Sequence, residues 1–303
     1  TTPEITDRSA AVNLNIQIRS AKGADEPVDI STIILNGAGK EVTRSEIKLG
    51  EFHDSLMNLS MHFSVADPEL WSVDHPYLYQ AVTRIVMGGQ TVDEYATPFG
   101  IRYFSFDPDN GFSLNGKEMK INGVCDHHDL GCLGAAVNKA AIRRQLVMLK
   151  DMGCNAIRTS HNPPAPELLD LCDEMGFLVM DEAFDMWKKQ KTPFDYHLAW
   201  DAWHRKDLED QVLRDRNHPS VIIWSIGNEI PEQWGKDSSG IRIAAELASI
   251  VRSLDTTRPI TSALNNPYPN NEIIRSGALD ALSPNRASAM AKYGTVSASI
   301  CAN

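Results

Sequence analysis

Long apolar runs are missing from this sequence. No stretch approaches the roughly 20 consecutive apolar residues that a membrane-spanning helix needs. Clusters of Lys and Arg are missing too: 40 acidic residues outnumber 29 basic ones, and the net charge is −11. Because nucleic acids and anionic membranes attract basic surfaces, the sequence argues against both as partners and fits an uncharged ligand.

Paired cysteines and nucleotide-binding motifs are also missing. The five Cys residues show no C-x-x-C spacing, and their odd number argues against a disulfide scaffold or a zinc site. No G-x-G-x-x-G or G-x-x-x-x-G-K-[ST] segment follows a strand, which removes support for a nucleotide-binding protein. The segment TTPEITDRSA is not a secretory signal and starts with Thr, so we expect that the native start is missing. The compartment stays open, with the bacterial periplasm and the extracellular space included.

Residues 1–104 have the pattern of an all-β domain. Apolar and polar residues alternate over 12–19 and again over 57–63, as in strands with one buried face. Gly and Pro clusters separate such runs at short intervals. About seven short strands in about a hundred residues predict an immunoglobulin-like β-sandwich.

After a turn-rich linker at 107–111, residues 105–303 alternate short apolar runs with amphipathic helices. Strand–helix alternation predicts a parallel sheet, either doubly wound or a (β/α)8 barrel. The expected strands cover 119–124, 154–160, 177–183, 221–226 and 259–264, and the expected helices cover 139–152, 165–175, 200–215 and 238–254.

Polar side chains gather where four of these strands end. In (β/α)8 enzymes the active site lies at the C-terminal ends of the strands, so this recurrence predicts a site there. A lone His is more often structural, and Arg158 can equally serve to pair with Glu229 or Asp181. The candidate residues are His127, Arg158, His161, Asp181, Asn228 and Glu229.

Glu229 is the strongest candidate for proton transfer. It directly follows the apolar strand VIIWSIGN, and a carboxylate near Trp224 can have a raised pKa, as a general acid at neutral pH requires. Asn228 beside it could hydrogen-bond a sugar hydroxyl. The alternative is a Glu at the start of a helix, where the macrodipole favours a carboxylate.

Several segments resemble glycoside hydrolase family 2. DEAFDMW and HHDLG look most like its β-galactosidase members, and LWSVDHPYLY (70–79) and FGIRYFSF (99–106) are similar to its immunoglobulin-like domain and the junction into its barrel. The remaining segments that carry the resemblance are WSIGNE (224–229), RTSHNPP (158–164), VMDEAFDMW (179–187) and GVCDHHDLG (123–131).

The resemblance implies an immunoglobulin-like β-sandwich at 1–104, followed by an incomplete (β/α)8 TIM barrel at 105–303. The implied reaction is retaining hydrolysis of a terminal β-linked sugar from an oligosaccharide or glycoside, with Glu229 as acid/base. Asn228, His161 and His127 would contact the sugar. The alternatives are a β-glucuronidase, a β-mannosidase or a noncatalytic carbohydrate-binding remnant. The full-length enzyme could form an oligomer.

The sequence departs from the family pattern in two ways. The family's nucleophile lies in a G-S-E-like context after the seventh strand, and no such motif follows Glu229. Where some members bind magnesium, this chain has Met186 and Lys188, so neither a metal nor another cofactor is carried over. Residues 105–303 fall just short of the roughly 200 residues that a small barrel needs. We therefore expect this chain to be truncated and inactive alone.

Overall fold

The structure is a computed structural model that describes residues 1–20, 24–52, 56–234 and 239–263. The chain divides into two compact units, residues 1–104 with 114–116 and residues 105–113 with 117–303. The boundary after residue 104 remains a proposal as a domain assignment. Within the described residues, no helix is long and apolar enough to cross a bilayer.

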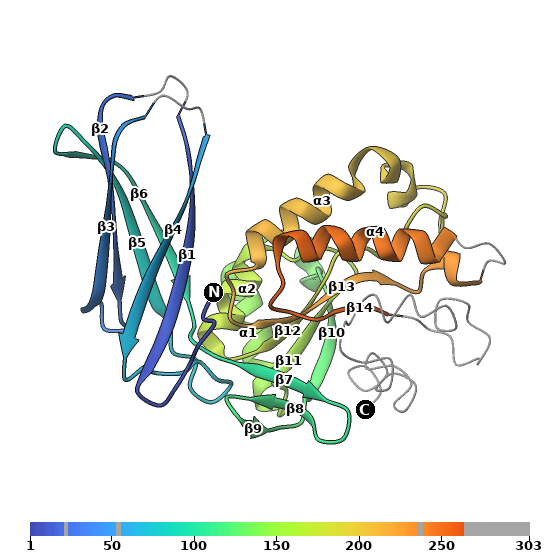
Figure 1. Cartoon of the computed structure of the whole chain (residues 1–303). Coiled ribbons are helices and arrows are strands. Elements are labelled where there is room, and N and C mark those ends of the chain that lie inside the picture. Colours follow the sequence, from blue (N-terminus) through green and yellow to red (C-terminus); the bar gives the residue numbers. More distant parts are fainter. Residues whose placement is uncertain (21–23, 53–55, 235–238, 264–303) are drawn as a thin grey trace. The chain divides into compact units, whose positions relative to one another are not determined.

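The first unit is built from two antiparallel sheets (Figure 1). Strand β1 (Ser9–Arg19) pairs with β4 (Leu56–Ala66), and both predicted alternations fall on this pair, with Val12 opposite Phe63. The other sheet has the order β3-β2-β5-β6. Its strands are β2 (Ala24–Leu35), β3 (Glu41–Phe52), β5 (Tyr79–Met87) and β6 (Gln90–Phe99). Side chains of both sheets form one core, which includes Ile30, Met61 and Phe63.

The predicted linker at 107–111 is the turn of a small sheet. Strands β7 (Phe104–Asp107), β8 (Gly111–Leu114) and β9 (Lys117–Glu118) form it. The Asp107 carboxylate accepts hydrogen bonds from the backbone N–H groups of Asp109 and Asn110, which is typical of a tight turn. Residues 107–111 therefore form a turn, as predicted. This turn joins two strands of a hairpin and is not a linker.

The second unit contains a five-stranded parallel sheet with the order β10-β11-β12-β13-β14. This order follows the chain without a reversal, whereas a doubly wound sheet reverses at its switch point. The sheet therefore corresponds to the first strands of a (β/α)8 barrel, as the resemblance implied. The strands are β10 (Gly123–His127), β11 (Ala156–Ser160), β12 (Leu178–Glu182), β13 (Val221–Asn228) and β14 (Ile260–Ala263).

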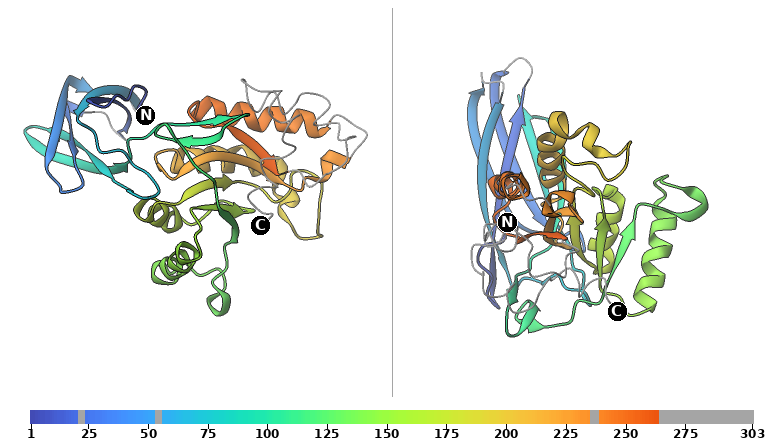
Figure 2. Two further views of the ribbon diagram at one scale, coloured as in Figure 1. Left: turned by 90° about the horizontal axis from the view of Figure 1, so that it is seen from below. Right: turned by 90° about the vertical axis from the view of Figure 1, so that its right-hand side faces the viewer.

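Four helices alternate with these strands (Figure 2). They match the predicted spans because their ends carry clear signals: the Asn138 side chain caps α1, and Gly176, with φ of 74°, ends α2. The helices are α1 (Lys139–Asp151), α2 (Pro166–Met175), α3 (Trp200–Asp215) and α4 (Ser239–Leu254). Short 3-10 turns occur at η1 (Gly131–Leu133), η2 (Tyr196–Leu198) and η3 (Pro231–Trp234).

The first barrel strand was predicted at the wrong place. It covers Gly123–His127, not 119–124. The Asn155 side chain accepts from the Asn122 N–H and donates to the Lys120 carbonyl, so these backbone groups are held by an amide outside the sheet. Only from Gly123 onward does the chain pair with β11.

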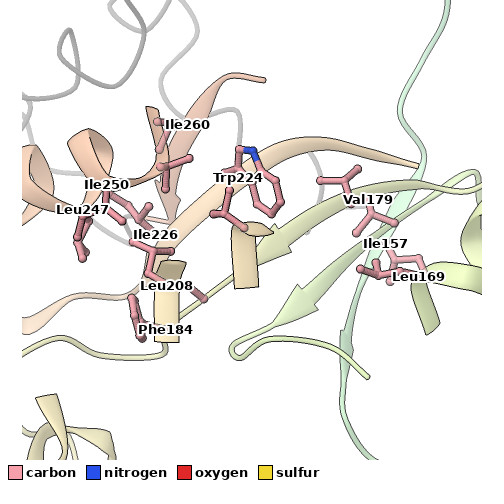
Figure 3. Close-up of a cluster of buried hydrophobic side chains, with 14 of the residues drawn as sticks. Ile157, Leu169, Val179, Phe184, Leu208, Trp224, Ile226, Leu247, Ile250 and Ile260 are labelled. Atoms are coloured by element: carbon pink, nitrogen blue, oxygen red, sulfur yellow. The ribbon is translucent and has the colours of Figure 1, made fainter. Parts of the chain in front are cut away.

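Strands β11, β12 and β13 are buried along their whole length, as in parallel sheets covered on both faces. Figure 3 shows the apolar cluster of this unit, in which Val179, Trp224 and Ile226 of the strands meet Leu208 and Leu247 of the helices. This core fixes the strands relative to one another, and the candidate residues lie at the C-terminal ends of these strands.

Strand β13 is irregular at two points. Opposite β12 its register shifts between Val179 and Met180, which pair with Val221 and Ile223. Opposite β14 it shifts again, since Ser225 pairs with Thr261 and Asn228 with Ala263. Each shift adds one residue to β13, as a β-bulge does, and bulges commonly re-aim side chains near active sites.

Candidate active site

A buried carboxylate, Glu182 at the end of β12, is the centre of the polar cluster. It accepts hydrogen bonds from Arg158 Nε (3.0 Å) and Nη2 (2.9 Å) and from Ser225 Oγ (2.6 Å). His161 Nδ1 lies 2.7 Å from its other oxygen. Side chains of β11, β12 and β13 are thereby fixed to one another. A buried ion pair with all its hydrogen bonds satisfied holds a defined geometry.

Arg158 also connects Glu182 with Asn228. Its Nη2 donates to Asn228 Oδ1 at 2.6 Å, and the Asn228 amide donates in turn to Asp185 Oδ1 at 2.9 Å. The prediction that Arg158 pairs with Glu229 or Asp181 was therefore wrong. The Asn228 amide is fixed between the Arg158 cation and the Asp185 anion. These two contacts set the direction of its second N–H.

The two histidines of the prediction lie together. The rings of His127 and His161 pack edge to face with centroids 5.0 Å apart. His127 is exposed, and His161 is partly exposed. Adjacent His128 points elsewhere, with Nε2 3.0 Å from the Ala135 carbonyl oxygen, as strand alternation predicts.

Glu229 follows β13 directly and has an exposed side chain. Its φ is +47°, in the left-handed region that residues with a Cβ seldom adopt. Its N–H donates to the Ala263 carbonyl at 2.7 Å. The next element after it is the short 3-10 turn η3, so Glu229 does not start an α-helix. Strained backbone of this kind is concentrated at functional sites.

Trp224 does not lie beside Glu229 as predicted. Its indole Nε1 donates to Asp255 Oδ2 at 2.8 Å, and the Arg258 guanidinium lies 5.7 Å from its ring. Trp224 therefore belongs to the helix side of β13.

Asp181 does not belong to the cluster either. It is fully buried on the opposite face of β12, where it accepts a hydrogen bond from Gln211 Nε2 of α3 at 2.8 Å. Burial and the charge of Asp215 raise the pKa of Asp181 well above its usual range. Neighbouring residues in a strand point to opposite faces, so Glu182, not Asp181, reaches the site.

The irregular end of β13 brings Asn228 into the cluster. Ser225 and Asn228 are three positions apart, so a regular strand would place them on opposite faces. The register shift between them turns both toward Arg158 and Glu182. Gly227 lies within this segment, and a Cβ there would come within 2.5 Å of Ile230 Cδ1 and 2.7 Å of Trp187 Nε1.

Side chains bind three successive carbonyl groups at this end of β13. Trp187 Nε1 donates to the Ile226 carbonyl (2.7 Å), and Ser262 Oγ donates to the Gly227 carbonyl (3.1 Å). Lys191 Nζ donates to the Asn228 carbonyl (2.9 Å) and to Asp185 Oδ1 (2.7 Å). Burial alone would raise the pKa of Asp185, but the hydrogen bonds from Lys191 and Asn228 outweigh it and lower this pKa.

Glu182 and Asp185 lie at or just beyond the end of the third predicted strand but were not among the candidate residues, and Lys191 was missed altogether. Among the described residues, no three His, Cys, Asp or Glu side chains gather as ligands of one metal ion would. The arrangement offers an exposed carboxylate, a fixed amide and two imidazoles at one edge of the sheet. Such a set suits proton transfer to a polar ligand.

Both parts of the chain match models of one protein family. Residues 108–298 match "Glycosyl hydrolases family 2, TIM barrel domain", and residues 1–102 match "Glycosyl hydrolases family 2". A β-galactosidase of Bacteroides ovatus, BoGH2A, is 45% identical over 94% of this chain and 37% of its own length. A β-glucuronidase of Bacteroides fragilis is 30% identical over 87% of the chain and 37% of its own length.

Solved structures show the same relationship. A glycosyl hydrolase family 2 member from Bacteroides cellulosilyticus superposes with a TM-score of 0.85 at 40% identity, over 93% of this chain and 35% of that one. The chain thus spans about a third of the length of these relatives. Both units match, and the parallel sheet of the second unit agrees with the TIM barrel that its match names. The chain belongs to glycosyl hydrolases family 2.

Proposed function

We propose that this chain supplies the acid/base half of a retaining β-glycosidase site, and that the complete protein hydrolyses terminal β-galactosides. The observation that carries the proposal is Glu229, an exposed carboxylate in left-handed backbone at the end of β13. It lies next to Asn228, which the Arg158–Glu182 pair holds in place. The 45% identity with a protein named β-galactosidase supports the galactoside.

In the proposed reaction, Glu229 acts first as an acid. Its proton passes to the glycosidic oxygen while the bond from that oxygen to the anomeric carbon breaks, and a second carboxylate bonds to that carbon. Water then attacks the same carbon, its proton goes to Glu229, and the bond to the second carboxylate breaks. The acid and the free second carboxylate are thereby regenerated, and the sugar is released with retained configuration.

Glu182 does not suit the role of the second carboxylate. A nucleophile has to lie about 5–5.5 Å from the acid/base with a free oxygen. Both oxygens of Glu182 already bind Arg158, Ser225 or His161, and its side chain is fully buried. We propose that the nucleophile comes from outside this chain and that the 303 residues alone do not turn over substrate.

We assign the sugar contacts to Asn228, His161 and His127. The Asn228 amide is oriented by Arg158 and Asp185, so it can present one N–H to a sugar hydroxyl. The paired rings of His127 and His161 offer further donors at the exposed edge. Arg158 acts by holding Asn228 and Glu182 in place. We assign no sugar contact to Asp181.

The test is Glu229→Gln in the full-length protein that carries this chain. We expect kcat/KM for 4-nitrophenyl β-galactoside to fall by about 10²- to 10⁴-fold, the usual contribution of general acid–base catalysis. The loss should shrink for a 2,4-dinitrophenyl galactoside, whose leaving group needs little protonation. Glu174→Gln, at an exposed salt bridge with Arg143, is the matched control. Equal activity of Glu229→Gln and wild type would refute the assignment.

The runner-up is a β-glucuronidase, since several relatives carry that name. Parallel assays with nitrophenyl β-galactoside, β-glucuronide and β-mannoside distinguish these sugars. Sugar binding by calorimetry without turnover of any of them would indicate a noncatalytic carbohydrate-binding protein instead.

A further inference from the structure

The segment between β12 and α3 returns a lysine to the strand end that carries Glu229. We propose that Lys191 is a positioning residue for Glu229, holding the backbone of the proton donor in its catalytic geometry. The inference rests on the proposed function, and it gives a role to a side chain that does not itself need to touch the substrate.

The contact is made at the peptide bond that joins Asn228 to Glu229. Lys191 Nζ donates to the carbonyl oxygen of this peptide at 2.9 Å. The N–H of the same peptide donates to the Ala263 carbonyl at 2.7 Å. Both polar groups of the peptide are therefore bound, one from each side, which fixes its plane.

Glu229 needs this support because of its own backbone. With φ at +47° it lies in a region that is unfavourable for a residue with a Cβ. Such a conformation persists only where the surroundings over-determine it. Without the ammonium group, the Asn228 carbonyl would be free to turn toward water, and Glu229 could relax to ordinary φ values.

Asp185 links this backbone clamp to the side chain of Asn228. Its Oδ1 accepts from Lys191 Nζ (2.7 Å) and from Asn228 Nδ2 (2.9 Å). Lys191 is only 20% exposed in its side chain, so water competes little for these contacts. One ammonium therefore fixes the main chain of Asn228 directly and its amide through Asp185.

The loop presents Lys191 from an ordered turn. The Asp195 carboxylate accepts hydrogen bonds from the N–H groups of Lys191 (2.7 Å), Thr192 (2.6 Å) and His197 (3.0 Å). The lysine backbone is thus held before its side chain reaches the strand. Because Lys191 is already ordered, little further conformational entropy is lost when substrate binds.

The test compares leaving groups in the full-length protein. A misplaced proton donor harms substrates that need protonation more than those that do not. For Lys191→Met we expect kcat/KM to fall by about 10- to 100-fold with methyl β-galactoside, in line with the effect of small misplacements. With 2,4-dinitrophenyl β-galactoside the fall should stay below about threefold. Lys191→Arg, which keeps a cation, should restore most of the difference.

Lys188→Met is the matched control. It removes a lysine from the same loop whose ion pair with Asp201 is exposed on both sides, so kcat/KM for both substrates should stay as in wild type. Should Lys191→Met not fold, as judged by circular dichroism and gel filtration, Asp185→Asn is expected to give the same split between substrates.

The outcomes separate the inference from the proposed function. If Glu229→Gln shows the split and Lys191→Met loses activity equally on both substrates, Lys191 is merely structural and the inference is wrong. If Glu229→Gln itself shows no split, the acid/base assignment fails. A split in both variants supports both.

Discussion

At the scale of single residues, β12 carries two neighbouring carboxylates with opposite surroundings. Glu182 faces the polar cluster and pairs with the Arg158 guanidinium. Asp181 faces α3, where burial and the charge of Asp215 raise its pKa, so its neutral form is favoured. Two neighbouring carboxyl groups therefore serve an ion pair on one face and a hydrogen bond from an amide on the other.

This difference predicts different responses to amide substitution. Glu182→Gln leaves the buried Arg158 cation without its anion and should destabilise the protein by about 3–5 kcal/mol. Asp181→Asn should cost little, because an amide resembles the neutral acid. A carboxyl group whose pKa is raised stabilises the folded protein at low pH, and this contribution is lost as pH rises through the folded-state pKa. Asn does not titrate, so Asp181→Asn should also reduce this loss of stability.

Urea unfolding of both variants between pH 5 and 9 measures these effects. A Glu182→Gln protein as stable as Asp181→Asn would contradict the assignment of the two faces.

Strand ends are easy to locate in a sequence, so five of the six candidate residues lie at the edge where they were predicted, while their roles stay predictions. His127, Arg158, His161, Asn228 and Glu229 all lie at the C-terminal edge of the sheet. Asp181 was misassigned because the sequence did not show which face of β12 looks outward. Lys191 could not be found, since the loop that returns it to β13 has no periodic pattern.

At the scale of elements, the turn between α3 and β13 is fixed by a histidine. His218 Nδ1 lies 2.6 Å from Asp173 Oδ2 of α2, and the other oxygen of Asp173 accepts the Ser220 N–H. Burial by itself lowers the pKa of His218, but the hydrogen bond and charge of Asp173 and the charge of Asp215 outweigh it and raise this pKa. The contacts of Asp173 with His218 and Ser220 thus tie the start of β13 to α2.

The sign of this shift predicts a pH dependence. Stability from a raised His pKa is fully present below the ordinary value near 6.5 and is lost as pH rises through the folded-state pKa. His218→Gln should therefore cost about 1–3 kcal/mol at pH 5.5 and less at pH 9. Urea unfolding across this range measures it.

His75→Gln is the control for His218→Gln, because the contact of His75 with Glu69 is exposed on both sides. It should change stability by less than about 1 kcal/mol at each pH. A cost for His218→Gln that grows with pH would show that the sign is wrong.

Helices were predicted more closely than strands and turns. Caps such as Asn138 and Gly176 set helix ends locally, so the sequence carries the information within a few residues. The start of β10 depends instead on Asn155, more than 30 positions away, and the two register shifts of β13 depend on both neighbouring strands. Such long-range causes leave no local pattern.

At the scale of the whole molecule, the described residues contain two separate hydrophobic cores. One includes Met61 and Phe63, and the other includes Leu208 and Leu247. Separate cores predict unfolding in two steps, because each unit can lose its packing independently.

Two core substitutions test this independence. Phe63→Ala should lower the midpoint temperature of one transition and Leu247→Ala that of the other. Each substitution should reduce the free energy of unfolding of its unit by about 2–5 kcal/mol. Differential scanning calorimetry of the chain measures both. A single transition that both variants shift equally would show that the two units unfold as one.

The irregular end of β13 makes the number of residues as important as their identity. Ser225 and Asn228 are three positions apart and share a face because a bulge takes up the extra residue between them. A one-residue insertion between them would keep both side chains but, by the alternation of a strand, turn Asn228 toward the helices, whereas many point substitutions would leave its direction intact. Gene libraries for this protein should therefore add no codon between 225 and 228, and a frame-preserving codon gain there should be more damaging than most missense changes.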